Sequence, residues 1–429
     1  MKVNFKDDAK WKGSVKYYIL SFSYNDKEIL NIDRAGRVIS FISIDSTTKK
    51  TTYKKAFDGS WLGIERANGI APRTRFYLSN NQIESVYQKI DSFKLILIEK
   101  LSQFQNIEVS FDPSDVYSAK PFQSTIEFWI SVLRNVAIQQ NNDDRTKFHS
   151  IYSNVSILPP DRYGSLVLQV TTGCIYNKCS FCTLYAGIPY IHKSPSEFEG
   201  HINDVTSFMS ESLGRFHSIF IGDANALTVP FKDLIEIFKI INKRFKIKES
   251  KSSYIQKKEP IFEGVFSFLD VFTGFKLTTE HFRELASMNL RMVYLGIETG
   301  SQKVLKLLNK PNTKPKIIQI IKSLHETDIG VAVIFLIGAG GKQFEEDHII
   351  ESIKLIQEMN LNTKDIVYFS KLVITGNYKN AIEENNIKSL TEQELEDQLK
   401  VFKRKLDNYY KIRETKPITT RYELLDFIY

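Results

Sequence analysis

Three cysteines, Cys174, Cys179 and Cys182, lie within nine residues of one another, and the sequence contains no others. An odd and crowded set of thiols does not form a disulfide framework, which joins distant parts of a chain. Clustered cysteines in an intracellular chain are instead typical of metal or redox sites. Three thiolates in one loop can hold three corners of a [4Fe–4S] cube and leave the fourth iron without a protein ligand. An open iron is useful where a small molecule must bind the metal.

Other interpretations of the same thiols remain open at this point. A zinc ion completed by His192 would suit three thiolates, although zinc loops usually pair C-x2-C with a second pair elsewhere in the chain. The protein would then be a non-catalytic zinc-binding or electron-transfer protein. Metal analysis after anaerobic reconstitution separates these possibilities, since a cube brings about four iron and four sulfide per chain.

The composition is that of a globular protein. The chain has 429 residues and a net charge of +8, and 42% of its residues are hydrophobic. These values support a large buried core and exclude a mainly disordered chain. The first eight residues lack the apolar run of a signal peptide, and the most apolar stretch, 330–341, is too short to span a bilayer. We therefore expect a cytoplasmic protein without a membrane span.

From residue 165 onward, short apolar runs alternate with longer amphipathic segments. Such βα steps predict parallel strands joined by right-handed crossovers. Six steps favour an α/β fold in the form of an open partial (βα)6 TIM-like barrel over a closed eight-strand barrel. The expected strands are 166–171, 218–222, 261–267, 292–296, 331–338 and 366–373. The expected helices are 196–213, 231–245, 279–288, 314–327 and 344–359.

The region before the barrel is predicted to be an α+β accessory domain. Alternating β-forming runs precede a helical period at 82–104, and another helix is expected at 124–140. We place the boundary near 150–162, because residues 142–144 and 159–161 are expected to interrupt regular structure. The region after the barrel contains a long charged helix and is predicted to be a helical extension. The predicted domains are 1–155, 163–380 and 381–429.

Several motifs follow the expected strands in a fixed order. The cysteines come after the first strand with the spacing C-x4-C-x2-C, Ile-Gly-Asp-Ala-Asn occupies 221–225 after the second, and Leu-Gly-Ile-Glu-Thr-Gly-Ser occupies 295–301 after the fourth. A glycine-rich segment, 338–341, ends the fifth. This series resembles the radical S-adenosylmethionine (radical SAM) superfamily over residues from about 163 to 375. The common family spacing is C-x3-C-x2-C, so this chain has one extra residue between the first two cysteines.

The resemblance implies two cofactors, a [4Fe–4S] cluster bound by the three cysteines and S-adenosylmethionine bound to the open iron. Glu298 would accept hydrogen bonds from the ribose hydroxyls, and Lys310 would pair with the methionine carboxylate. Asp223 stands where the family commonly has Gly-Gly-Glu and would hold the amino group. The implied cofactor-binding residues are Phe181, Gly222, Asp223, Glu298, Ser301, Lys310, Ile337 and Gly338.

The resemblance also implies the reaction. The reduced cluster would cleave S-adenosylmethionine to a 5′-deoxyadenosyl radical, which takes a hydrogen atom from a substrate that the motifs do not name. A ferredoxin or flavodoxin would supply the electron. Because the chain has three cysteines in all, family members with an auxiliary cluster, such as methylthiotransferases, are excluded.

An alternative is a radical SAM enzyme that modifies RNA. Cations and aromatic residues are mixed at 54–61 and 73–77, a composition that suits phosphate contacts and base stacking. A polar loop with buried aromatic residues would have the same composition, and no RNA-binding motif matches. A salt-dependent affinity for RNA would favour this alternative.

Overall fold

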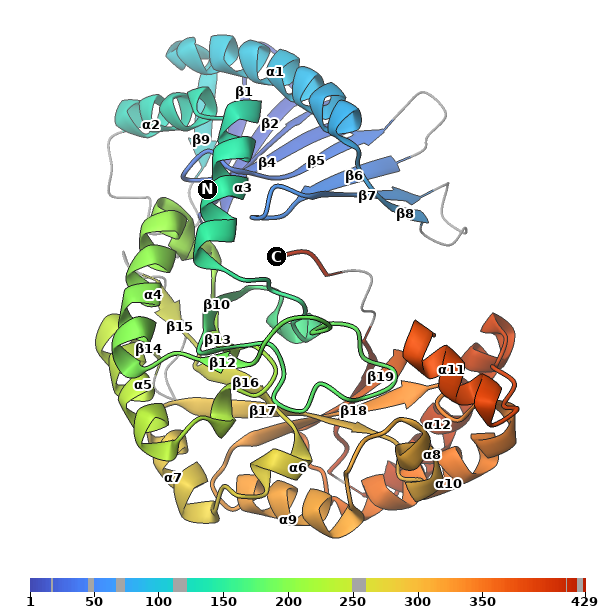
Figure 1. Ribbon diagram of the computed structural model, residues 1–429. Coiled ribbons are helices and arrows are strands. Elements are labelled where there is room, and N and C mark those ends of the chain that lie inside the picture. Colours follow the sequence, from blue (N-terminus) through green and yellow to red (C-terminus); the bar gives the residue numbers. More distant parts are fainter. Residues whose placement is uncertain are drawn as a thin grey trace.

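The computed structural model describes residues 1–16, 18–44, 50–66, 74–110, 122–248, 260–413, 415–422 and 427–429. Two large sheets organise these residues, a nine-stranded antiparallel sheet near the N-terminus and a seven-stranded parallel sheet after it (Figure 1). Arg73, the first residue of the cation-rich stretch at 73–77, lies outside the described residues.

The parallel sheet confirms the predicted α/β fold. Its strand order is β10-β13-β16-β17-β18-β19-β20, and each neighbouring pair is parallel. Within the described residues no pairing joins β10 to β20, so the sheet is an open partial barrel. The strands are β10 (Ser165–Gln169), β13 (Ser218–Gly222), β16 (Val265–Leu269), β17 (Leu290–Glu298), β18 (Gly330–Ile337), β19 (Ile366–Lys371) and β20 (Ile418–Arg421).

The prediction of six strands was wrong by one, because the segment predicted to be a helical extension also contributes β20. Ile418 pairs with Ile366 of β19, and Arg421 pairs with Phe369. The sequence of β20, Ile-Thr-Thr-Arg, has no apolar run, and its residues are exposed or half-buried. A short polar strand at a sheet edge gives little sequence signal, so its pairing depends on the tertiary structure.

Helices follow the strands and cover the outer face of the open barrel (Figure 1). The helix α5 is amphipathic: Leu234, Phe238 and Ile241 are buried one and two turns apart. None of the helices in the described ranges has both the length and the apolar character needed to cross a membrane. The barrel helices are α4 (Pro195–Met209), α5 (Phe231–Arg244), α6 (Val271–Gly274), α7 (Thr279–Ser287), α8 (Gln302–Leu307), α9 (Lys314–His325), α10 (Gly341–Glu358), α11 (Gly376–Glu384) and α12 (Glu392–Tyr410).

The N-terminal sheet is an antiparallel meander with the order β8-β7-β6-β5-β4-β3-β2-β1-β9. Helices α1 (Asn80–Ser102) and α2 (Phe122–Arg134) contribute buried side chains to its core, where the rings of Trp11 and Phe93 lie 4.8 Å apart. The strands are β1 (Lys2–Phe5), β2 (Trp11–Lys16), β3 (Ile19–Tyr24), β4 (Glu28–Asp33), β5 (Val38–Ile44), β6 (Lys50–Lys55), β7 (Trp61–Arg66), β8 (Thr74–Tyr77) and β9 (Ile107–Ser110).

The helix predicted at 124–140 is instead two helices, since α2 ends at Arg134 and α3 (Ile138–Ile151) follows. Residues 142–144 lie inside α3 and do not interrupt regular structure. Tertiary contacts explain the difference, because Asp144 is buried and bridges two cations of the N-terminal sheet. Arg37 Nε lies 2.9 Å from Asp144 Oδ1, and Lys55 Nζ lies 3.0 Å from Oδ2.

The same arginine joins the N-terminal sheet to the barrel. Arg37 donates hydrogen bonds to the carbonyl of Phe208 at the end of α4 and to the hydroxyl of Ser212 just beyond it. Ser212 in turn donates to Asp33 of β4. Since these groups are buried and paired, the network gives the two parts a defined relative position.

Candidate active site at the carboxyl ends of the barrel strands

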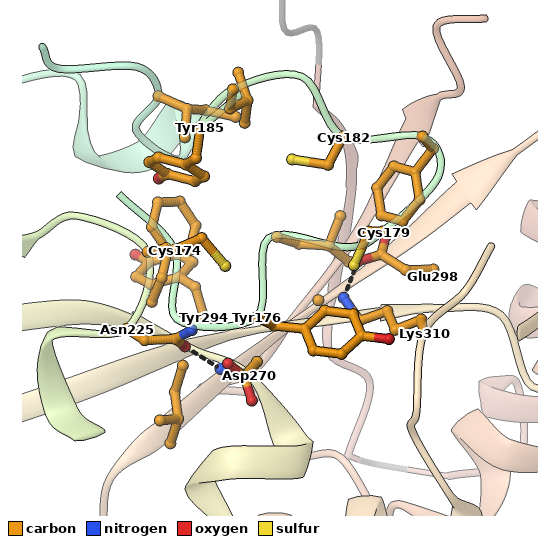
Figure 2. A pocket seen from close by; sticks show the side chains of 18 of the residues that line it. Cys174, Tyr176, Cys179, Cys182, Tyr185, Asn225, Asp270, Tyr294, Glu298 and Lys310 are labelled. Carbon is orange, nitrogen blue, oxygen red and sulfur yellow. Dashed lines mark hydrogen bonds and ion pairs between the residues drawn. The ribbon is translucent and has the colours of Figure 1, made fainter. Parts of the chain in front are cut away.

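The three cysteine thiols line one cavity of about 200 Å³ at the carboxyl ends of the parallel strands. Figure 2 shows the three sulfur atoms pointing toward the same space, with Glu298 and Lys310 on one side and Asn225 and Asp270 below. Of the residues predicted to bind S-adenosylmethionine, Phe181, Glu298 and Lys310 line this cavity. Residues that are 136 positions apart in sequence therefore meet at one site.

The cysteine loop leaves the sheet through Gly173. This residue has a φ of +68°, and a Cβ atom would lie 2.7 Å from the carbonyl oxygen of Pro189. Both the positive φ and the close approach of the backbone require glycine. The loop then passes over the segment that follows α8, and that segment holds it in place.

A set of hydrogen bonds connects the cysteine loop to residues 307–309. Ser180 donates from its backbone nitrogen to Leu308 and from its hydroxyl to Leu307, at 3.0 Å each. Asn309 Nδ2 donates to the carbonyl of Lys178 over 2.7 Å, and the Tyr176 hydroxyl donates to the carbonyl of Asn309 over 2.8 Å. These bonds fix the loop against the C-terminal end of α8 without involving a thiol, so the sulfur atoms stay available as ligands.

The thiols are held in a dehydrated environment. Burial raises the pKa of Cys179 to about 12 and also raises the pKa of Cys182. Thiolates are the form that binds a metal, so a cluster would have to displace these protons and would stabilise the charge itself. The donor set fits a thiolate-ligated iron–sulfur group, which takes one thiolate at each of three separate iron atoms.

The alternative zinc site is not assembled from the predicted residues. His192 lies exposed in the short strand β12 (Ile191–His192), which pairs with β11 (Thr171–Thr172), and it is not among the residues that line the cavity. Across the described residues, no group of three or more His, Cys, Asp or Glu side chains is placed to hold a single metal ion.

Glu298 and Lys310 form a buried ion pair at the edge of the cavity. Lys310 Nζ lies 2.6 Å from Glu298 Oε1, and both side chains are less than 10% exposed. Gly296 leaves the room for this pair, since a Cβ there would lie 2.5 Å from Oε1 and 2.9 Å from Nζ. Glu298 and Lys310 are predicted to bind different parts of the ligand, and their side chains are in contact with each other.

The backbone of Glu298 is strained. Its φ is +69°, a left-handed conformation that side-chain-bearing residues rarely adopt, and the pairing of β17 with β18 shifts register between Gly296 and Glu298. Such a conformation costs about 1–3 kcal/mol and is found mostly at functional sites. It turns the carboxylate at the end of β17 toward Lys310.

Lys310 keeps its charge despite being buried. Burial by itself lowers its pKa, but the Glu298 carboxylate and the nearby Cys179 outweigh that effect, so the pKa is raised above its usual value. The ammonium group also lies 5.9 Å from the centre of the Phe181 ring. The Lys310 ammonium group therefore lies beside the cysteines as the cationic member of an ion pair.

Asp223 does not line the cavity, although the sequence comparison with the family assigned it to a ligand amino group. Gln169 Nε2 lies 3.1 Å from one of its carboxylate oxygens and 3.3 Å from the other. Burial raises the pKa of Asp223 to about 7. Gly222, the last residue of β13, is likewise outside the lining.

The other predicted residues outside the cavity lining have local contacts. Ser301 caps the N-terminus of α8 and donates its hydroxyl to Asp347. Gly338 donates its backbone nitrogen to Gln398 Oε1 over 2.7 Å. On β18 the cavity is lined by Ile334 and Leu336, whereas Ile337 is not part of the lining, because successive strand side chains point to opposite faces.

Several lining residues were missed from the sequence. Asp270 directly follows β16 and Ser370 lies near the end of β19, so the rule that sites form at strand ends could have identified both. The aromatic residues carried no such signal, because buried and cavity-lining aromatic side chains look alike in a sequence. The missed residues include Tyr176, Tyr185, Asn225, Asp270, Tyr294 and Ser370.

The part of the chain that contains the site matches a known protein family. Residues 168–356 match the model of the radical SAM superfamily. These residues form a radical SAM domain. Its presence implies a [4Fe–4S] cluster and S-adenosylmethionine as cofactors, and the matched range includes the three cysteines, Glu298 and Lys310. No curated protein matches the sequence.

Solved structures with similarity to this chain include radical SAM proteins. Coproporphyrinogen III oxidase from Escherichia coli is 14% identical, with a TM-score of 0.40, and the match covers 58% of this chain and 52% of that chain. Methylornithine synthase is 14% identical, with a TM-score of 0.38 and coverage of 64% and 74%. Elp3 from the archaeon Methanocaldococcus infernus is 15% identical, with a TM-score of 0.36 and coverage of 60% and 56%. The chain thus spans about half the length of the coproporphyrinogen oxidase.

Proposed function

We propose that this protein is a radical SAM enzyme that cleaves S-adenosylmethionine reductively and uses the product to remove a hydrogen atom from a substrate yet to be identified. The observation that carries the proposal is the assembly of three cysteine thiols and the Glu298–Lys310 pair in one cavity at the strand ends. A cofactor held there would lie at the position where parallel α/β barrels carry their chemistry.

In this proposal Cys174, Cys179 and Cys182 bind the [4Fe–4S] cluster and leave one iron for the amino-acid portion of S-adenosylmethionine. When bound and reduced, the cluster supplies the single electron that converts S-adenosylmethionine to methionine and a 5′-deoxyadenosyl radical. The protein contributes binding, orientation and exclusion of water. A one-electron donor such as a ferredoxin or flavodoxin is the proposed partner.

Glu298 and Lys310 are proposed to bind the polar groups of S-adenosylmethionine. An ammonium group has three donors, so Lys310 can pair with the methionine carboxylate while it keeps its bond to Glu298. The Glu298 carboxylate has a second oxygen that can accept from a ribose hydroxyl. Their mutual ion pair holds both side chains in place before a ligand arrives, which lowers the cost of ordering them.

The remaining predicted residues are proposed to shape the site. Phe181 lines the cavity and is proposed to pack against the adenine. We propose that Asp223, Ser301 and Gly338 act indirectly, since their polar groups bond to neighbouring protein groups. The proposed shaping residues are Phe181, Gly222, Asp223, Ser301, Ile337 and Gly338.

Buried tyrosine side chains near the cavity support a role in excluding water. Tyr294 and Tyr368 extend from β17 and β19, and each donates its hydroxyl to Asp161 over 2.7 Å. Tyr294 also lines the cavity, and its side chain is fully buried. Exclusion of water would protect a reactive intermediate from side reactions.

The test is anaerobic reconstitution with iron and sulfide, followed by dithionite and S-adenosylmethionine. We expect about four iron and four sulfide per chain and the formation of 5′-deoxyadenosine. Cys179→Ala should lose the cluster and the cleavage together. Ile175→Ala is the matched control, because Ile175 lies in the same loop with an exposed side chain. Stoichiometric zinc without 5′-deoxyadenosine, or cleavage that survives in Cys179→Ala, would contradict the proposal.

A further inference from the structure

Many polar groups of the cavity are satisfied by the protein, and the Ser370 hydroxyl is a buried, uncharged group there without a hydrogen-bond partner. Glu298 pairs with Lys310, and the hydroxyls of Tyr176 and Tyr294 donate to Asn309 and Asp161. Among the described residues that line the cavity, Asp270 has a buried carboxylate oxygen, Oδ2, without a hydrogen-bond partner. A buried carboxylate oxygen without a partner is costly and is commonly satisfied by a ligand.

The two oxygens of Asp270 have different surroundings. Oδ1 accepts from the backbone nitrogen of Thr273 over 2.7 Å and from its hydroxyl over 2.6 Å, and so caps the short helix α6. The backbone nitrogen of Asp270 donates to Asn225 Oδ1 over 2.8 Å (Figure 2). One oxygen therefore holds the local structure, and Oδ2 has no comparable partner.

Asp223, on the neighbouring strand end, is arranged in the opposite way. Both of its oxygens lie within hydrogen-bond distance of Gln169 Nε2, and it does not line the cavity. The carboxylate at the position of the family motif is therefore already hydrogen-bonded within the protein. Asp270, one strand further along the sheet, lines the cavity and has a carboxylate oxygen without a hydrogen-bond partner.

The cavity charges match an amino-acid zwitterion. Such a group needs an anion for its ammonium and a cation for its carboxylate, and the cavity contains Asp270 and Lys310. Building on the proposed function, we propose that Asp270, rather than Asp223, binds the ammonium group of S-adenosylmethionine through Oδ2. Asn225 is then a positioning residue, because its bond to the Asp270 backbone connects the loop after β13 to this carboxylate.

The electrostatics of Asp270 agree with this assignment. Burial raises the pKa of Asp270, and the bonds from Thr273, the charge of Lys310 and the side chain of Asn225 offset part of that effect. A bound ammonium group would offset the rest of the cost of burying the charged Asp270 carboxylate. Hydrogen bonds between charged groups are the strong ones, so losing this contact should cost about 10- to 100-fold in affinity.

The test compares the binding of two ligands to the unaltered protein and to its variants, measured by calorimetry on reconstituted protein. The ligands are S-adenosylhomocysteine and its analogue with hydrogen in place of the ammonium group. The key variant is Asp270→Asn, because asparagine is a good N-cap and preserves the bond to Thr273 while it replaces Oδ2 by an NH2 group. Asp270→Ser, which can also cap a helix, is the second variant if the first fails to fold. Asp223→Asn is the matched control.

We expect the unaltered protein to bind S-adenosylhomocysteine about 10- to 100-fold more tightly than the analogue. Asp270→Asn should lose at least tenfold of that preference, and Asp223→Asn should retain it. An unchanged preference in Asp270→Asn, or its loss in Asp223→Asn alone, would overturn the assignment. Failure of the unaltered protein to bind either compound would instead contradict the proposed function.

Discussion

The buried ion pair between Glu298 and Lys310 allows a prediction that needs no cofactor. Two unit charges 2.6 Å apart attract each other by roughly 6 kcal/mol at an effective dielectric constant of about 20. Most of that attraction offsets the cost of dehydrating both ions, so the pair adds little net stability. Removing one partner leaves the other charge buried alone, which costs about 3–5 kcal/mol. Lys310→Met should therefore destabilise the metal-free chain strongly.

The assay is urea unfolding of the metal-free protein, followed by circular dichroism. Lys310→Met should lower the apparent free energy of unfolding by about 3–5 kcal/mol, and adding Glu298→Gln should recover a large part of that loss. Lys342→Met is the control, because Lys342 lies at the same 2.6 Å from Glu394 but both side chains are more than a third exposed. That change should cost about 1 kcal/mol or less. Equal losses in the two lysine variants, or additive losses in the double variant, would refute the reasoning.

Two further predictions concern the loop and the pH dependence of stability. Gly173→Ala should lower the number of iron atoms retained per chain. Residue 173 has a φ of +68°, and a Cβ atom there would lie 2.7 Å from the Pro189 carbonyl oxygen, so the loop would have to move. Full iron content in this variant would refute the prediction. Burial lowers the pKa of His201 to about 3 and of His348 to about 4, so the unfolded state binds more protons below pH 6.5. Each histidine should therefore cost about 1.4 kcal/mol of unfolding free energy at pH 5.5 relative to pH above 7.5. Urea midpoints of the unaltered chain and of a His201→Gln, His348→Gln variant test this, and equal pH slopes would contradict it.

Local patterns were sufficient to predict most of the parallel sheet. Runs such as 331–337 are apolar throughout because both faces of the strand are covered, and this feature appears directly in the residue types. The edge strand β20 could not be predicted in this way, since three of its four residues are polar and the strand pairs with β19 only after the chain returns from α12. Residues 142–144 were wrongly predicted to interrupt regular structure for a related reason. Asp144 is tolerated in a helix because it forms buried ion pairs with Arg37 and Lys55.

Some residues of the candidate site could likewise be predicted from local sequence patterns, and others could not. The spacing of Cys174, Cys179 and Cys182 identified the loop, because ligands that lie close in sequence must lie close in space. Residue spacing also predicted that Asp223 binds the ligand. In the structure Gln169 hydrogen-bonds to the Asp223 carboxylate, and Asp270 lines the cavity instead. Which of two similar carboxylates faces the cavity depends on contacts between strands that are distant in sequence.

The sequence by itself determined the chemistry that this protein can carry and the alternation of strands and helices that supports it, since both depend on residue types at short spacing. Tertiary structure decided the partners. It paired Glu298 with Lys310, twelve residues away in sequence, and it left Oδ2 of Asp270 without a hydrogen-bond partner. It also added a seventh strand to the barrel. Hydrogen bonds and ion pairs form between groups that folding brings together, and no local pattern specifies which of several equivalent groups will meet.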